Sequence, residues 1–173
     1  MRKELFFALV AVCILTHTVR LAYEILKHRQ IVKPGKLSFV IILFNMILLW
    51  VSWVLLCRYD IFKIAPPNII RYAGISLAGI GIIVFLTGLI TIKTLESYEG
   101  DLITTGIYSI VRHPMYLGFI FWLIGFPIYF GAPFAMALSL LFIVNILFWR
   151  YLEGKELEKR FPSYPDYKRT TIF

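Results

Sequence analysis

Long apolar stretches alternate with short polar segments along this chain. Helix is the form expected for each apolar stretch, because a lipid interior offers backbone N–H and C=O groups no hydrogen-bond partner. The five stretches run over Leu5–Leu26, Leu37–Leu56, Ile69–Ile92, Tyr116–Tyr129 and Pro133–Trp149. A membrane-spanning helix needs about 20 apolar residues. The pattern therefore predicts an all-α, polytopic membrane bundle with about five transmembrane helices.

The five stretches differ in regularity. The segments Leu37–Leu56 and Ala73–Ile92 hold no charged residue, whereas polar side chains interrupt the first stretch. These interruptions are Thr16, His17, Thr18 and Arg20. The N-terminus imitates a signal peptide, with a basic start and an apolar core, but no small-x-small cleavage site follows. We therefore expect the first stretch to be retained as a span.

The last two stretches are short and close together. The segments Gly125-Phe126-Pro127 and Gly131-Ala132-Pro133 lie between them, and glycine with proline is typical of turns. The sequence thus predicts a tight helical hairpin over residues 116–149.

Composition supports the membrane class. Of the 173 residues, 60% are hydrophobic and only 16% are charged, which is too few to coat a soluble surface. A chain of this length is expected to form one integral membrane domain over residues 1–173.

The basic residues predict an orientation. With five spans the termini lie on opposite sides, and cytoplasmic loops carry the excess of Lys and Arg. One side would hold Arg2, Lys3, Arg58, Lys63 and Arg71. The other would hold Arg20, Lys27, Arg29, Lys33, Lys36, Lys93, Arg112, Arg150, Lys155, Lys159, Arg160, Lys168 and Arg169. The asymmetry predicts a cytoplasmic C-terminus. The net charge of +8 is then explained by topology and by attraction to anionic membrane lipids, and no nucleic-acid partner is expected.

Cysteine and glycine suggest packing rather than chemistry. Cys13 and Cys57 lie far apart in or beside apolar spans, so we expect neither a disulfide nor a zinc site. The glycines of the third stretch are expected to permit close helix packing. They are Gly74, Gly79, Gly81 and Gly88.

Polar residues gather in two segments, residues 93–116 and 150–167. The predicted hairpin returns the chain to its starting side, so both segments should face the cytoplasm and lie side by side. The first contains Arg112-His113-Pro114, preceded by Gly106-Ile107-Tyr108 and followed by Tyr116. A glycine, two tyrosines, an imidazole and a guanidinium at the mouth of a helix pair could enclose a charged cofactor.

These residues carry a family resemblance. The run Thr105-Gly106-Ile107-Tyr108 followed by Arg112-His113-Pro114-Met115-Tyr116 resembles the signature of the isoprenylcysteine carboxyl methyltransferase family, whose relatives include membrane phospholipid methyltransferases. The tail agrees, with a glutamate, a phenylalanine and two spaced tyrosines. These are Glu153, Phe161, Tyr164 and Tyr167. The resemblance covers roughly residues 102–167, so residues 93–173 are expected to carry the catalytic motifs.

The resemblance implies a pocket for S-adenosylmethionine built from the loop and the tail. The positions that match cofactor-binding positions of the family are Leu102, Ile103, Tyr108, His113, Pro114, Met115, Tyr116 and Glu153. Arg150 resembles the catalytic arginine that holds the carboxylate of the substrate. The tail departs from the family pattern in four ways: Gly154 follows Glu153, the step from arginine to glutamate is three residues, Phe161 is followed by Pro162, and the spacing to the first tyrosine is one residue shorter.

The implied chemistry can be argued from the functional groups. A carboxylate is ionised at neutral pH, so it needs no base to accept a methyl group from a sulfonium. A desolvated site favours such a charge-neutralising reaction, and an arginine can hold the carboxylate through two hydrogen bonds. The motif offers no set of metal ligands, so we expect no metal.

The expected acceptor is lipidic, because its apolar part could stay in the bilayer. A prenylated cysteine is the first candidate. A phospholipid amine is the second, and it needs a base such as Glu153 or His113 to remove a proton. Two further alternatives remain: a small membrane reductase using a nicotinamide cofactor, and a non-enzymatic scaffold or channel.

Overall fold

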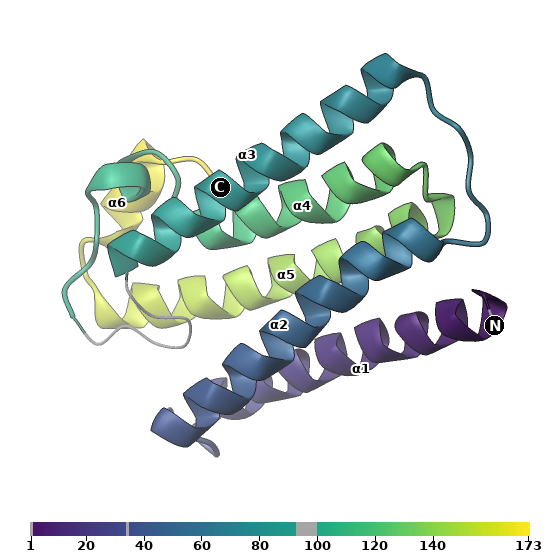
Figure 1. Cartoon of the computed structure of the whole chain (residues 1–173). Helices are drawn as coiled ribbons and strands as arrows, with labels where there is room; N and C mark the ends of the chain where they lie inside the picture. Colours follow the sequence, from purple (N-terminus) through teal and green to yellow (C-terminus); the bar gives the residue numbers. More distant parts are fainter. Residues whose placement is uncertain (1, 34, 93–99) are drawn as a thin grey trace.

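The protein is a bundle of helices in the computed structural model, which describes residues 2–33, 35–92 and 100–173 (Figure 1). The elements are α1 (Arg2–His28), α2 (Lys36–Tyr59), α3 (Asn68–Ile92), the short 3-10 helix η1 (Gly106–Ser109), α4 (Pro114–Phe130), α5 (Pro133–Arg160) and α6 (Tyr164–Thr170). The described residues form no strand, and their β pairing is limited to an isolated bridge between Val111 and Ile172. The all-α fold class is therefore confirmed.

Four of the helices, α1, α2, α3 and α5, are long and apolar enough to cross a membrane. The fifth apolar helix, α4, has 17 residues and is shorter. These five helices correspond to the five apolar stretches, so the polytopic membrane bundle predicted from hydropathy is also confirmed.

Helix α5 ends eleven residues later than the apolar stretch that predicted it. It runs on from Trp149 to Arg160 because residues 150–160 are rich in Leu, Glu, Lys and Arg, which favour helix. Hydropathy predicts where the membrane-spanning part ends, whereas the helix itself continues because the following residues favour helix. As a result Arg150 and Glu153 lie within a regular helix.

The turn between α4 and α5 is tighter than predicted. Gly125 and Pro127 lie inside α4, and the chain reverses only at Gly131 and Ala132. Gly131 adopts a left-handed conformation with a φ of 59°, which suits a helix C-terminus. Pro133 then occupies the first turn of α5, where its missing N–H is harmless.

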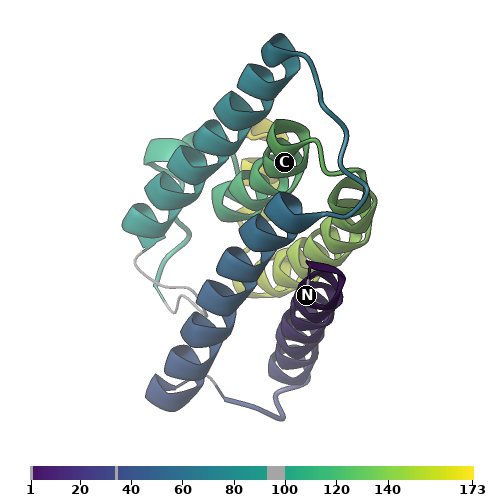
Figure 2. The same cartoon turned by 45° about the vertical axis from the view of Figure 1, so that its right-hand side comes forward.

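The two ends of the bundle hold different loops. The start of α1 meets the start of α5 where the Phe6 and Phe134 rings lie 5.0 Å apart. Here the buried Asp60 carboxylate accepts hydrogen bonds from the backbone N–H of Phe62 at 2.9 Å and of Ala135 at 3.0 Å. The opposite end carries η1, α6 and the C-terminus (Figure 1). The chain thus begins at one end of the bundle and finishes towards the other (Figure 1), and the turned view shows α1 lying beside α2 (Figure 2).

Helices α3 and α4 touch through their backbones. Gly74, Gly81 and Gly88 are spaced by seven on one face of α3, where Gly74 faces Gly125 of α4, Gly81 faces Gly118 and Gly88 faces Pro114. A Cβ atom at Gly81 would lie 2.6 Å from the carbonyl oxygen of Gly118. Small residues at such contacts let membrane helices approach closely. The predicted packing role holds for these three α3 glycines, but a Cβ atom at Gly79 would meet nothing within 4 Å.

Polar groups join α1 to α2. The Asn45 side-chain amide donates to the Thr16 carbonyl oxygen at 3.1 Å, and the Cys13 thiol donates to the Ser52 hydroxyl at 3.4 Å. Both cysteines are buried and free, as the sequence predicted.

We predict that Gly81→Ala destabilises the protein by about 1–3 kcal/mol, because the added methyl group overpacks the α3–α4 contact. Gly79→Ala is the matched control on the same helix. It should be neutral or slightly stabilising, since alanine favours helix over glycine. Unfolding of both variants in detergent measures the difference, and equal stabilities would contradict the role of the glycine contact.

Candidate functional site

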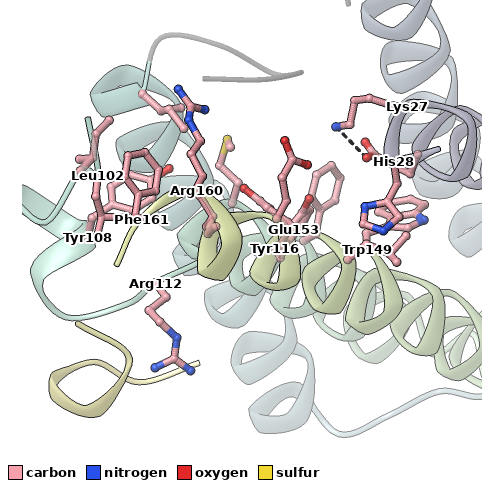
Figure 3. Close-up of a pocket in the computed structure, with 18 of the residues that line it drawn as sticks. Lys27, His28, Leu102, Tyr108, Arg112, Tyr116, Trp149, Glu153, Arg160 and Phe161 are labelled. Atoms are coloured by element: carbon pink, nitrogen blue, oxygen red, sulfur yellow. Dashed lines mark ion pairs between the residues drawn. The ribbon is translucent and has the colours of Figure 1, made fainter. Parts of the chain in front are cut away.

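An open cavity lies at the end of the bundle that carries η1 and α6 (Figure 3). It encloses ≈ 1330 Å³ of empty space, its open mouth included. Most of the lining comes from α1, the segment 101–116 and the last part of α5, and α2, α3 and α6 contribute Met46, Phe85, Ile92 and Tyr167.

The His113–Tyr116 run occupies the start of α4. His113 is the residue before the helix, and Pro114 follows in its first turn, where proline is favoured. The Pro114 ring packs against Gly88 of α3, where a Cβ atom would come within 2.9 Å of it. Because Gly88 has no side chain, it leaves the space that the Pro114 ring occupies.

The imidazole of His113 links two segments of the tail. Its Nδ1 lies 3.5 Å from Oε2 of Glu153 on α5, and its Nε2 lies 3.4 Å from the hydroxyl oxygen of Tyr164 on α6. Both contacts are satisfied when Nδ1 carries the proton and Nε2 accepts from Tyr164. Burial raises the pKa of Tyr164, which keeps the phenol protonated and able to donate at neutral pH.

Glu153 is the carboxylate of the motif that faces the cavity. His113 is buried behind it, whereas the Glu153 side chain is 40% exposed, and it lines the cavity. Its carboxylate stands in the open space between Arg160 and the α1 residues Lys27 and His28 (Figure 3). The hydroxyl group of Tyr116 also interacts with it. A carboxylate placed in this way can accept hydrogen bonds from a ligand or pair with a cationic one.

Two more phenols hold the loop against the tail. The Tyr167 hydroxyl donates to the backbone carbonyl of Tyr108 at 2.6 Å, and the Tyr108 hydroxyl lies 3.4 Å from the Gly88 carbonyl. Burial raises the pKa of Tyr108 and also that of Tyr167, the latter to about 12. Both phenols therefore keep the protons with which they donate.

Arg112 holds the C-terminal segment through hydrogen bonds. Its guanidinium donates to the carbonyl oxygens of Lys168 and Thr171, both at 2.7 Å, and extends towards that segment (Figure 3). Its backbone N–H donates to Ile172 at 3.1 Å. The Tyr167–Tyr108 and His113–Glu153 contacts confirm that the polar segments 93–116 and 150–167 lie side by side, for residues 100–116 of the first. Residues 93–99, with the predicted cytoplasmic Lys93, lie outside the described part of the chain.

The structure distributes the predicted site residues over three places. Six of them line the cavity: Leu102, Ile103, Tyr108, Met115, Tyr116 and Glu153. His113 and Pro114 stand behind it and support Glu153 and the start of α4. Arg150 lines another cavity, to which His113, Arg112 and Lys168 also contribute, and Arg112 lines both cavities. The guanidinium carbon of Arg150 lies 4.6 Å from the centre of the Phe173 ring. Arg150 and Glu153 therefore do not share one cavity, although three residues separate them.

Sequence reasoning missed the wall that α1 contributes. Arg20, Glu24 and Lys27 line the cavity opposite the motif, and Arg20 and Glu24 are buried. Their spacing puts them on one helix face, and charged side chains near a membrane span are a functional signal. That signal was visible as the interruption at Arg20, but only the fold shows which helix α1 faces.

Metal binding has no structural support. Within residues 2–33, 35–92 and 100–173, no three His, Cys, Asp or Glu side chains are grouped so that they could hold a metal ion. Independence from metals stays a prediction.

Comparison with known proteins identifies the family. The model of the phospholipid methyltransferase family matches residues 69–163, which is more than half of the chain and includes α3, η1, α4 and the Glu153 region. The chain therefore belongs to this family of membrane methyltransferases. The family resemblance drawn from the motifs is thereby confirmed.

One similar protein is the Protein-S-isoprenylcysteine O-methyltransferase of Saccharomyces cerevisiae. The two sequences are 36% identical over 64 residues, which are 37% of this chain and 25% of the yeast protein. The match thus spans about a quarter of the length of this relative. No solved structure matches the chain.

We predict that Arg112→Gln releases the C-terminal segment from the loop. Hydrogen bonds from a charged donor contribute about 1.5–3 kcal/mol, so amide hydrogen exchange in residues 164–173 should become faster. Arg169→Gln is the control, because Arg169 pairs with Asp166 at a site where both side chains are 82% exposed, and such pairs contribute little. Unchanged exchange rates in the Arg112 variant would show that these hydrogen bonds do not stabilise the C-terminal segment.

Proposed function

We propose that this protein is an S-adenosylmethionine-dependent methyltransferase that acts on a membrane-embedded lipidic acceptor. The observation that carries the proposal is the cavity in which Glu153, Tyr116, Met115 and Tyr108 meet, inside the region matched by the family model. The family favours this function over a nicotinamide-dependent reductase. A scaffold or channel would have no use for a buried histidine that positions a carboxylate.

The residues of the cavity fit such a cofactor. Glu153 offers an acceptor for amino or hydroxyl groups, while Leu102, Ile103 and Met115 offer apolar contacts. When bound, the cofactor supplies a methyl group on a sulfonium, which an acceptor oxygen or nitrogen displaces to leave a neutral thioether. The chain contributes orientation, because His113 and Tyr116 both interact with the Glu153 carboxylate. Such fixed groups lower the cost of aligning two reactants.

A second, apolar cavity supports a lipidic acceptor. It has an empty volume of ≈ 350 Å³ and shares Met46, Phe119 and Trp149 with the first. His17, whose ring stacks on Phe142 at 3.5 Å, lines it about one turn before Arg20 on α1. Four tryptophans line this cavity: Trp50, Trp53, Trp122 and Trp149. We propose that the apolar chain of the acceptor occupies it while the polar head reaches the first cavity.

A prenylated cysteine carboxylate is the acceptor that we favour. It needs no base, and the name of the similar yeast protein gives a substrate of this class. A phospholipid amine is the second candidate, favoured by the name of the matching family. For that acceptor Glu153 is placed to take the proton that the ammonium must lose.

Arg150 remains the arginine proposed from the resemblance to act in catalysis. Its place beside Phe173 favours an indirect action, in which it holds the C-terminal segment that carries Tyr164 and Tyr167. We further propose that the cavity end of the bundle faces the cytoplasm, because most of the basic residues lie there.

Transfer of a labelled methyl group tests the function directly. Purified protein should methylate an S-prenylcysteine when it is given labelled S-adenosylmethionine, and should methylate phosphatidylethanolamine less. Transfer to phosphatidylethanolamine alone would establish the second candidate. Absence of transfer to both acceptors would refute the proposed function.

We predict that Glu153→Gln and His113→Ala weaken binding of S-adenosylhomocysteine, the demethylated cofactor. Loss of a charge-assisted hydrogen bond costs about 1.5–3 kcal/mol, or roughly 10- to 150-fold in affinity. Calorimetric titration of the detergent-solubilised protein provides the measurement.

Two variants serve as controls for this titration. Glu158→Gln removes a carboxylate of the same helix that pairs with Lys168 at 3.0 Å outside the main cavity, and Cys13→Ala alters a buried thiol far from the motif. Both should keep the affinity. Full affinity in the Glu153 and His113 variants would remove the core of the site assignment.

A further inference from the structure

The polar residues that interrupt the first apolar stretch form a line along α1. His17, Arg20, Glu24 and Lys27 follow each other at steps of three and four residues, which places them on one helix face. His17 lines the apolar cavity, and the other three line the main cavity. This line lies outside residues 69–163, so the family match assigns it no role.

Arg20 is the central cation of the line. It is 5% exposed, pairs with Glu24, and lies with its guanidinium carbon 5.6 Å from the centre of the Trp149 ring. Its Nε atom is buried without a hydrogen-bond partner in the described structure. A buried guanidinium with an unused donor is costly unless something accepts from it.

The α1 wall carries two cations, Arg20 and Lys27, that pair with the same carboxylate. Glu24 is shared, because its Oε2 also lies 2.8 Å from Nζ of Lys27. Two cations thus divide one carboxylate. The rest of the lining carries both signs of charge, since Asp101, Glu153 and Glu156 line it together with Arg112 and Arg160.

We infer that Arg20, assisted by Lys27, binds the anionic group of the methyl acceptor. The inference rests on the proposed function and adds to it the helix that recognises the acceptor. Arg20 lines the main cavity, and its guanidinium carbon lies 5.6 Å from the centre of the Trp149 ring, which lines both cavities. A lipid whose chain occupies the apolar cavity therefore presents its head group to Arg20. The anion is a carboxylate in a prenylcysteine and a phosphate in a phospholipid.

Direct binding tests the inference without turnover. Intrinsic tryptophan fluorescence of the detergent-solubilised protein reports the affinity for an S-prenylcysteine and for its carboxamide, which differs only in lacking the charge. The wild type should prefer the carboxylate. Arg20→Gln should lower that preference by roughly 10- to 100-fold, and Arg20→Lys should keep part of it. A second pair of probes, phosphatidylethanolamine and its phosphate methyl triester, tells phosphate recognition from carboxylate recognition.

Controls separate recognition from stability. Arg29→Gln alters an exposed arginine one residue beyond α1 and should keep the full preference. Glu24→Gln should keep or increase it, because Arg20 and Lys27 lose a competing carboxylate. A purely structural ion pair predicts instead that Arg20→Gln and Glu24→Gln reduce stability alike and leave the preference unchanged, which would overturn the inference.

The cofactor is the other possible source of a carboxylate. Arg20→Gln should therefore bind S-adenosylhomocysteine with wild-type affinity. If Arg20→Gln binds this compound more weakly and keeps the wild-type preference for the charged acceptor, the inference is overturned, because Arg20 then binds the carboxylate of the cofactor. Lack of any charge preference in the wild type would overturn it too. If the wild type prefers the charged acceptor but transfers no methyl group, the proposed function is refuted, whereas the assignment of Arg20 to an anion-binding site is retained.

Discussion

In the α3–α4 pair the two backbones meet through glycine, and the position of the cavity follows from this contact. Lipid offers no hydrophobic drive for helices to associate, so close packing must hold them together. Gly81 and Gly118 bring the helices together, and Gly88 leaves the space for the Pro114 ring. His113 then stands at the start of α4, opposite Glu153 of α5. Any side chain at these glycines would displace the motif from its carboxylate.

The cavity combines two environments that suit a reaction between a charged ligand and a lipid. Its motif side offers Glu153, held by His113, to cationic or hydrogen-bonding groups. Its α1 side offers Arg20 and Lys27, which share one carboxylate. Beneath lies a cavity lined by tryptophan. We propose that the cofactor and the acceptor meet between these walls, so that opposite charges orient both of them before the methyl group moves.

Much of this arrangement could be predicted from the sequence, because it depends on local patterns. Hydropathy located the five helices, and the motif located Tyr108, Tyr116 and Glu153 at one cavity. The end of α5 could not be predicted from hydropathy, because residues 150–160 are polar and still helical. The three-residue spacing of Arg150 and Glu153 correctly predicted that both lie on the same side of α5. That side borders two cavities, and the sequence does not show that each residue lines a different one. The role of α1 depends on which helices pack together over long sequence distances, and the local pattern does not contain that information.

The central claim is that the cofactor lies between the motif and the last part of α5. Photochemical cross-linking of radiolabelled S-adenosylmethionine to the full chain in lipid vesicles, followed by peptide mapping, tests it most directly. The account predicts label in residues 101–116 and 149–161, and loss of that label when excess S-adenosylhomocysteine competes. Competable label in residues 60–66, at the other end of the bundle, would contradict it.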